Sequence, residues 1–357
     1  MRLRLALLAA LLAAAATAQA ARAAEPSPAL NQVIKDAQKE GRLDLSWLPS
    51  FFGADGVAEL VKGMNATFGT NLAYSFTPDP GSVPRNLNKI LVAAQAHQPS
   101  PSDVFIGTTN HVLIMEKRQA AIPVDWTALL PGRITDKMVE ASNLAVRIYT
   151  TLPGGIIYNT KLAPERPQTL ADLLKPEWKG KIATNPYAAS FDNLASDDFW
   201  GPDKTLDFAQ KFSKQIGGLI GCPDVERVAS GEFIAFAMAC SGREWVKLKR
   251  EGAPLDMAVP KDYAAQRYYY LMIPKNASHP NAGKLFVAYA LTSAGQKIIW
   301  NHDDYDLHTF PDSGMAQVMA GYEKEGVKFK ELSVTWLEKQ KDLRTLQERI
   351  IKILRGS

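Results

Sequence analysis

Apolar residues follow two different spacings along the chain, and segments with the two spacings alternate. Residues 43–47 alternate apolar and polar side chains as a half-buried strand does, whereas residues 57–68 and 87–94 carry apolar side chains at helical spacing. Residues 72–76 and 103–106 are further predicted strands, the second of them short, apolar and buried. Strands that alternate with helices predict an α/β fold with mainly parallel sheets.

The alternation resumes after Gly154, with predicted strands through Tyr158 and over 181–184. Two extended segments, 148–159 and 268–274, have the pattern of crossings between lobes. They predict a two-lobed organisation with lobe 1 formed by 24–150 and 271–315, lobe 2 by 151–270, and C-terminal helices over 316–357. The pattern assigns no lobe to the last helix, which carries an apolar stripe of Leu343, Leu346, Ile350, Ile351 and Leu354.

The N-terminus has the pattern of a secretory signal peptide. Arg2 and Arg4 precede an apolar run over 5–16, and Ala-x-Ala cleavage sites follow at 18–20 and 21–23. The alternative is a membrane anchor, but the run is shorter than the ~20 apolar residues that a spanning helix needs. We therefore expect cleavage of residues 1–23 and export to the periplasm.

Composition and charge narrow the class of protein. The chain is 46% hydrophobic and 22% charged, as globular proteins are, and the remainder after cleavage is long enough for about two domains. Arg2, Arg4 and Arg22 account for most of the formal net charge of +4. Because no basic surface remains to neutralise phosphates, we expect no nucleic-acid partner.

Two cysteines, Cys222 and Cys240, each follow an apolar stretch, and residues 224–230 between them form a predicted helix. If the two stretches are neighbouring parallel strands, both thiols lie at the same edge of a sheet and within disulfide reach. An oxidising compartment permits that bridge. The crossover is short for parallel strands, so two free, buried thiols are the alternative.

Five motifs occur in order along the chain: Gly155–Leu162, Leu170–Ile182, Val228–Glu232, His279–Ala282 with Leu285 and Phe286, and Leu291–Gln296. Their order and spacing resemble the extracytoplasmic solute-binding proteins of ABC importers, the family that includes the ferric-ion binding proteins. The resemblance implies a two-lobed periplasmic binding protein that closes over a small molecule and delivers it to a membrane permease. It also implies a monomer without a cofactor. We predict that most motif residues have structural roles and do not contact the ligand. Examples are Trp178, expected to cover a sheet edge, and residues 281–296, expected to form a packed helix.

The family's ferric site is not matched. The resemblance places a tandem tyrosine pair where residues 241–244 stand, and a histidine where residues 47–50 stand, and neither is present. The tandem tyrosines at 268–270 lie in the second crossing, where they favour a hinge strand over metal ligation. We therefore predict no metal site, and keep a ferric-ion or iron-chelate binding protein as the alternative.

Ligand-binding residues are expected in loops at the carboxyl ends of strands, where open α/β sheets bind ligands. Those loops are 47–52, 78–85 and 107–110 in lobe 1, and 185–193, 241–245 and 262–267 in lobe 2. These loops offer arginine guanidinium groups, hydroxyl groups and free N–H groups at helix starts, all of which can donate hydrogen bonds to a small organic anion. Aromatic rings in the same loops could cover the apolar part of that anion. The candidates are Trp47, Ser50, Ser82, Thr108, Thr109, Tyr187, Ser190, Ser241, Arg243, Tyr263 and Arg267.

Arg243 is the first candidate to hold the anion, and Arg267 is the second. The alternative for Arg243 is a surface pair with Glu244 or Asp262, and the alternative for each hydroxyl is an ordinary helix N-cap.

Other functions fit less well. The chain has no Gly-x-Ser-x-Gly elbow and no His-Glu-x-x-His pair, and the paired carboxylates at 197–198 and 303–304 point apart on regular structure. We therefore predict that the protein is not an enzyme. A ligand-sensing partner of a membrane receptor would have the same fold and remains an alternative to a transporter component.

Overall fold

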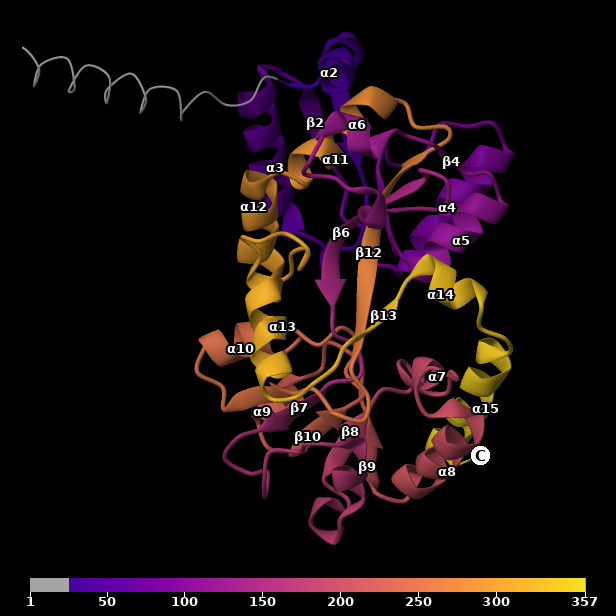
Figure 1. The fold of residues 1–357 in the computed structure, drawn as a ribbon, viewed down its shortest axis with the longest axis vertical. Coiled ribbons are helices and arrows are strands. Elements are labelled where there is room, and N and C mark those ends of the chain that lie inside the picture. Colours follow the sequence, from indigo (N-terminus) through magenta and orange to yellow (C-terminus); the bar gives the residue numbers. More distant parts are fainter. Residues whose placement is uncertain (1–25, 357) are drawn as a thin grey trace, which may run out of the picture.

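The computed structural model describes residues 26–356, which form two lobes, each built around a β-sheet with helices packed against it (Figure 1). The predicted signal peptide, residues 1–23, lies outside the described residues. Among residues 26–356, no helix is both long and apolar enough to cross a membrane.

Lobe 1 occupies the upper half of Figure 1. Its elements are α2 (Pro28–Glu40), β1 (Arg42–Leu45), α3 (Gly53–Phe68), β2 (Ala73–Phe76), α4 (Val83–Gln95), β3 (Phe105–Thr108), α5 (Thr109–Lys117), β4 (Ala121–Ile122), α6 (Trp126–Leu129), η1 (Asp136–Met138), β5 (Val139–Glu140), β6 (Ala145–Thr151), α11 (Pro280–Ala290) and α12 (Ser293–Asp303). All five strand and helix segments predicted over 43–106 form, with ends shifted by a few residues. The predicted helix over 281–296 is two helices, because the Thr292 side chain accepts the Gly295 N–H and starts a new one.

Lobe 2 contains β7 (Ile156–Asn159), η2 (Leu170–Leu174), η3 (Pro176–Trp178), β8 (Ile182–Thr184), α7 (Phe191–Leu194), α8 (Gly201–Ser213), β9 (Ile216–Leu219), α9 (Glu226–Ala229), β10 (Ala235–Ala237), α10 (Val246–Arg250) and β11 (Leu255–Ala258). The strand order is β11-β7-β10-β8-β9. Strands β10, β8 and β9 run parallel, whereas β7 is antiparallel to both of its neighbours.

The two predicted crossings lie side by side. Strand β12 (Ala265–Pro274) pairs antiparallel with β6, and it also pairs antiparallel with β3 and β4. The sheets are therefore mixed, and the expectation of mainly parallel sheets holds only in part. Tyr268 and Tyr270 lie on one face of β12 beside Arg147, whereas Tyr269 stacks on Tyr149 with ring centroids 4.8 Å apart. The tandem tyrosines thus pack both faces of the hinge strand.

The C-terminal segment passes between the lobes several more times (Figure 1). Helix α13 (Gly314–Lys324) buries Met315 and Met319 against lobe 2, and β13 (Lys330–Leu332) pairs with the start of β12. Helix α14 (Val334–Glu338) then packs against α5 of lobe 1, and α15 (Leu343–Arg355) against α7 and α8 of lobe 2. The predicted apolar stripe of the last helix therefore faces lobe 2.

Candidate functional site

A cavity of about 630 Å³ lies between the lobes, within the ~300–1,000 Å³ range of small-molecule sites. Three of the six predicted loops line it, namely 107–110, 185–193 and 262–267, and the C-terminal segment supplies a further wall. The lining residues are Thr108, Thr109, Asn110, Ile114, Ala189, Ser190, Asp192, Asn193, Arg267, Leu332, Trp336, Leu337, Leu343, Arg344 and Gln347.

Three polar atoms of this region are buried and make no hydrogen bond of regular geometry, although the Ser190 and Asn193 side chains lie close to the Tyr263 hydroxyl. They are the Ser190 Oγ, the Tyr263 hydroxyl and the Arg267 Nε. Ser190 and Tyr263 are 3% and 1% exposed. A buried polar group left unpaired costs about 1–3 kcal/mol, and more when it is charged. All three atoms can donate a hydrogen bond, so together they suit a group that accepts several.

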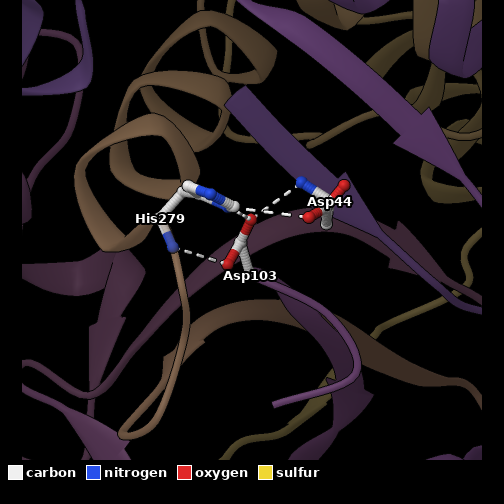
Figure 2. Close-up of side chains that lie close together, drawn as sticks. All are labelled: Asp44, Asp103 and His279. Carbon is white, nitrogen blue, oxygen red and sulfur yellow. Dashed lines mark hydrogen bonds and ion pairs between the residues drawn. The ribbon is translucent and has the colours of Figure 1, made fainter. Parts of the chain in front are cut away.

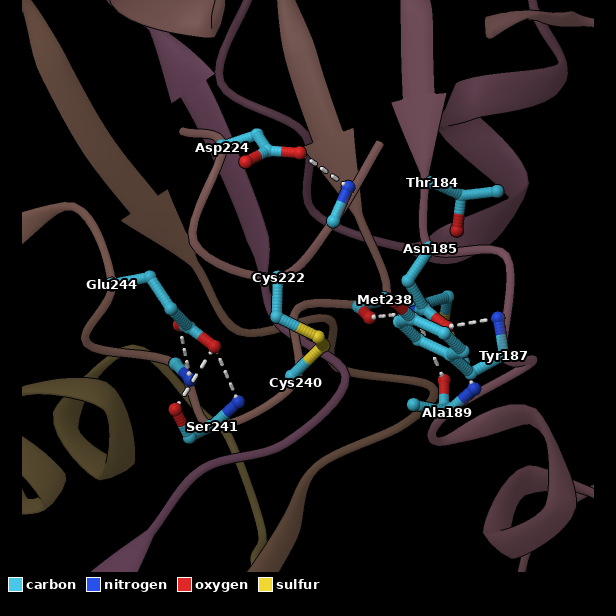
Figure 3. Close-up of a disulfide and its surroundings, with 12 residues drawn as sticks. Thr184, Asn185, Tyr187, Ala189, Cys222, Asp224, Met238, Cys240, Ser241 and Glu244 are labelled. Atoms are coloured by element: carbon cyan, nitrogen blue, oxygen red, sulfur yellow. Dashed lines mark hydrogen bonds between the residues drawn. A yellow bond between two sulfur atoms is a disulfide. The ribbon is translucent and has the colours of Figure 1, made fainter. Parts of the chain in front are cut away.

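Backbone geometry holds these donors in place. Ser190 has a left-handed φ of 73° at the start of α7, and the Asn185 side chain fixes the loop before it by accepting the Tyr187 and Ala189 N–H groups. The same Asn185 amide donates to the Met238 carbonyl on the neighbouring strand end, as Figure 3 shows. The loops after β8 and β10 are thus tied together beneath the cavity.

Arg267 is held by the hinge. Its Nη2 donates to the Cys240 carbonyl at 3.1 Å, and its own carbonyl accepts the Thr151 hydroxyl at 3.2 Å. The Tyr263 ring packs against Gly154, where a Cβ atom would lie only 2.0 Å from a ring carbon. Gly154 also has a φ of 86°, which other residues rarely adopt. Glycine is therefore required at position 154, because any larger residue would overlap the Tyr263 ring.

The charge of Arg267 acts on several neighbours. Burial raises the pKa of Asp192, and Arg267 partly opposes that rise. Burial also raises the pKa of Tyr263, so the phenol is neutral and can donate. Burial and Arg267 lower the pKa of His111 to about 4, so this histidine is uncharged at neutral pH. None of the ion pairs within 4 Å among residues 26–356 involves Arg267, whose guanidinium donates to the Cys240 carbonyl.

Thr108 and Thr109 line the cavity at the start of α5, but their hydroxyl groups already have partners. The Thr108 hydroxyl lies 2.9 Å from the His111 Nδ1 in a capping box, and the Thr109 hydroxyl donates to the Leu332 carbonyl at 3.1 Å. Their side chains therefore shape the cavity more than they supply free donors.

Seven of the eleven predicted residues are not among those that line the cavity, namely Trp47, Ser50, Ser82, Tyr187, Ser241, Arg243 and Tyr263. Trp47 is 1% exposed in the lobe 1 core, where its indole donates to the Phe51 carbonyl, so its predicted role over a ligand is wrong in this structure. Ser82 is the exposed N-cap of α4. Ser50 is also exposed, and Tyr187 is 54% exposed.

Arg243 points toward the α12–α13 connection and not into the cavity. Its Nε donates to the Asp304 carbonyl at 3.0 Å, its side chain is 8% exposed, and it lies over the Trp300 ring. Glu244, the predicted surface partner, instead accepts from the N–H and hydroxyl of Ser241. The first-ranked arginine is thus a packing residue of the connection, because a closer acceptor is available there.

Sequence reasoning missed the C-terminal wall. Asp192, Asn193 and Asn110 fall inside loops that were predicted to bind, but Trp336 and Gln347 fall in none. The only signal nearby was the apolar stripe of the last helix, and it says nothing about the cavity.

One group of three aspartate and histidine side chains, among residues 26–356, lies close enough together to share a metal ion: Asp44, Asp103 and His279 (Figure 2). The buried Asp103 already accepts the His279 and Asp44 backbone N–H groups, at 2.8 and 2.7 Å, and contacts the His279 ring at 2.9 Å. These bonds anchor the start of α11 to β1. The group lies within lobe 1 and shares no residue with the cavity lining.

Cys222 and Cys240 form a disulfide, with Cα atoms 5.9 Å apart (Figure 3). Of the two possibilities that the sequence left open, the bridge is therefore correct. The reasoning behind it is wrong in one respect, because β8 lies between β9 and β10 and the two strands are not neighbours. The loops that follow them reach across that strand.

Comparisons with known proteins agree on the kind of fold. A model of the bacterial extracellular solute-binding protein family matches residues 59–313. An uncharacterized protein of Haemophilus influenzae is 28% identical over 149 residues, which are 39% of this chain and 42% of that protein, so the match spans less than half of that relative.

Two solved structures share the fold at low sequence identity. The substrate-binding protein of an ABC transporter from Agrobacterium tumefaciens aligns with a TM-score of 0.69 at 15% identity, over 89% of this chain and 97% of its own. The Trichodesmium protein IdiA (FutA), in complex with iron and citrate, aligns with a TM-score of 0.62 at 16% identity, over 88% and 98%.

Proposed function

The chain belongs to the family of bacterial extracellular solute-binding proteins, and we propose that it captures a small organic anion between its lobes for the permease of an ABC importer. The family resemblance noted in the sequence is thereby confirmed. We propose further that the mature protein works in the periplasm as a monomer, without a cofactor or catalytic activity of its own.

The proposal of an anionic solute rests on one observation: Ser190 and Arg267, which line the cavity between the lobes, each have a buried donor atom without a partner. The buried Tyr263 hydroxyl lies near Ser190. A guanidinium offers a fork of donors matched to carboxylate oxygens, and hydrogen bonds to charged groups contribute roughly 1.5–3 kcal/mol each. That the Trichodesmium protein holds citrate with its iron is in keeping with an organic anion in this fold. Arg267 takes the role that the sequence had offered first to Arg243.

Native mass spectrometry of the purified mature protein tests the proposal by identifying any co-purified molecule. Calorimetric titration of that molecule then compares the wild type with Arg267→Ala, Arg267→Lys and a matched control, Arg243→Gln. We expect at least tenfold weaker binding for Arg267→Ala, which is ~1.4 kcal/mol, and partial recovery with lysine, because a point charge does not reproduce the fork. The control should bind as the wild type does.

A neutral or cationic co-purified solute, or full affinity in Arg267→Ala, would contradict the anionic solute. A tyrosinate-to-iron charge-transfer colour with one-to-one uptake of ferric citrate would favour the iron alternative instead. Small-angle scattering checks closure separately, because a protein that closes about the β6–β12 hinge must become more compact at saturation.

A further inference from the structure

The C-terminal segment forms one wall of the cavity and touches both lobes. Val334 of α14 is 3% exposed in the lobe 1 core, and Leu337 packs against the same core. Trp336, between them, packs against the lobe 2 core, and its indole N–H donates to the Asp198 carboxylate at 2.9 Å. Helix α14 therefore bridges the lobes beside the cavity, away from the hinge strands.

Helix α15 holds the far end of this wall on lobe 2. Ile350 and Leu354 are 0% and 5% exposed against that lobe, and the Gln347 side chain donates to the Tyr187 carbonyl at 3.1 Å. Tyr187 belongs to the loop that positions Ser190. The wall is thus fixed to the same loop that supplies one of the free donors.

The cavity consequently has two chemically different sides. The hinge and α7 present polar side chains, namely the donors of Ser190 and Arg267 together with Asp192 and Asn193. The opposite wall is formed by α5, β13, α14 and α15. It presents five apolar side chains together with Asn110, Arg344 and Gln347; the apolar ones are Ile114, Leu332, Trp336, Leu337 and Leu343. A solute that fills the space must meet both sides.

We propose that the solute is a carboxylate with an apolar ring or branched chain, and that Trp336 is the residue that selects it. This inference rests on the proposed function and names the class of anion. The carboxylate binds at Arg267, and the apolar body packs on Trp336 and the leucines around it. Burial of apolar surface stabilises by roughly 25 cal/mol per Å², and aromatic pairs gain further from ring stacking.

A polyhydroxylated anion of the same charge fits this wall poorly. Each hydroxyl group placed against Trp336, Leu337 or Leu343 loses its hydrogen bonds to water and gains none from those side chains. An unpaired buried polar group costs about 1–3 kcal/mol, so discrimination of tenfold or more follows from one such group.

Calorimetry on mature protein freed of bound solute by unfolding and refolding tests the inference with named probes. Phenylacetate and cyclohexylacetate carry apolar rings, whereas gluconate and citrate do not. We expect the first two to bind at least tenfold more tightly than the last two. Trp336→Ala should weaken phenylacetate binding at least tenfold. Trp336→Phe should recover most of the affinity, because phenylalanine keeps an aromatic ring against the solute. The recovery should be incomplete, because phenylalanine does not form the hydrogen bond to Asp198.

Trp200→Phe is the matched control. Its indole N–H also donates to an oxygen, the Asp262 carbonyl at 2.8 Å, but within lobe 2 and outside the cavity lining. Its affinity for phenylacetate should equal that of the wild type. Melting temperatures of all variants separate loss of binding from loss of folding.

Each outcome decides between the two proposals. If gluconate or citrate binds as tightly as phenylacetate and Arg267→Ala abolishes that binding, the apolar class is overturned and the proposed anionic function stands. If none of the four carboxylates binds the wild type, the carboxylate class is overturned, and the co-purified molecule decides the proposed anionic function separately. If Trp336→Ala binds phenylacetate unchanged, Trp336 does not select the solute.

Discussion

Removal of the Cys222–Cys240 disulfide should destabilise lobe 2 and loosen the anion site at the same time. The bridge closes a loop of 18 residues, and loop-closure entropy for that length corresponds to about 3 kcal/mol at 25 °C. We therefore expect the double variant Cys222→Ser/Cys240→Ser to unfold with a free energy lower by about 3 kcal/mol. Its serines avoid free thiols.

The link to the site runs through one hydrogen bond. The Cys240 carbonyl accepts from the Arg267 guanidinium, and the next residue, Ser241, is fixed by the Glu244 carboxylate. Without the bridge, this turn keeps its local bonds but loses its tie to the loop after β9. Arg267 should then be less well positioned, so the affinity for the co-purified anion should fall by severalfold.

Guanidinium titration of the variant and the wild type, each with and without reductant, measures the effect. The variant's slope against denaturant should be steeper, because its unfolded chain has no cross-link and exposes more surface. Reductant should lower the free energy of unfolding of the wild type to nearly that of the variant, and it should not change the free energy of unfolding of the variant. A wild type and variant with equal midpoints and slopes would refute the reasoning, and equal anion affinity would refute the link to Arg267.

Two further predictions concern the hinge and α12. Burial raises the pKa of Asp303 to about 7, so between pH ~4 and 7 the native protein keeps a proton that the unfolded chain releases. The free energy of unfolding should therefore fall as pH rises through this window, and Asp303→Asn should lose that slope; equal slopes would contradict the assignment. Gly154→Ala should lower stability and anion affinity, because its methyl group would overlap the Tyr263 ring. Gly252→Ala is the control, because Gly252 has a φ of 97° and no atom within 4 Å of an added Cβ, so that this variant has backbone strain without a steric overlap. Equal anion affinities of the two variants would contradict a role of Gly154 in positioning Tyr263.

Much of the fold followed from the sequence because helix and strand periodicity are local. The predicted elements over 43–106, the hinge strand around 268–270 and the final amphipathic helix all form. The rule that ligands meet the carboxyl ends of strands named six loops. Three of them line the cavity, namely 107–110, 185–193 and 262–267, and the other three do not. These inferences need only a few consecutive residues and the direction of the chain.

Side-chain roles within those loops did not follow, because they depend on contacts between distant segments. Ser82 and Ser190 both precede helices in the sequence, yet only Ser190 adjoins the cavity. Arg243 follows a strand as a ligand residue would, but Asp304, 61 positions away, takes its guanidinium.

What the sequence by itself determined was the family, the two lobes, the hinge strand and six candidate loops, of which three line the cavity. Only the tertiary structure decided that Arg267, and not Arg243, meets that cavity, and that the C-terminal segment encloses it. The bond between Trp336 and Asp198 joins residues 138 positions apart, on elements that no local pattern relates. Such contacts are set by how the two lobes and the C-terminal helices pack, and that packing minimises free energy over the whole chain.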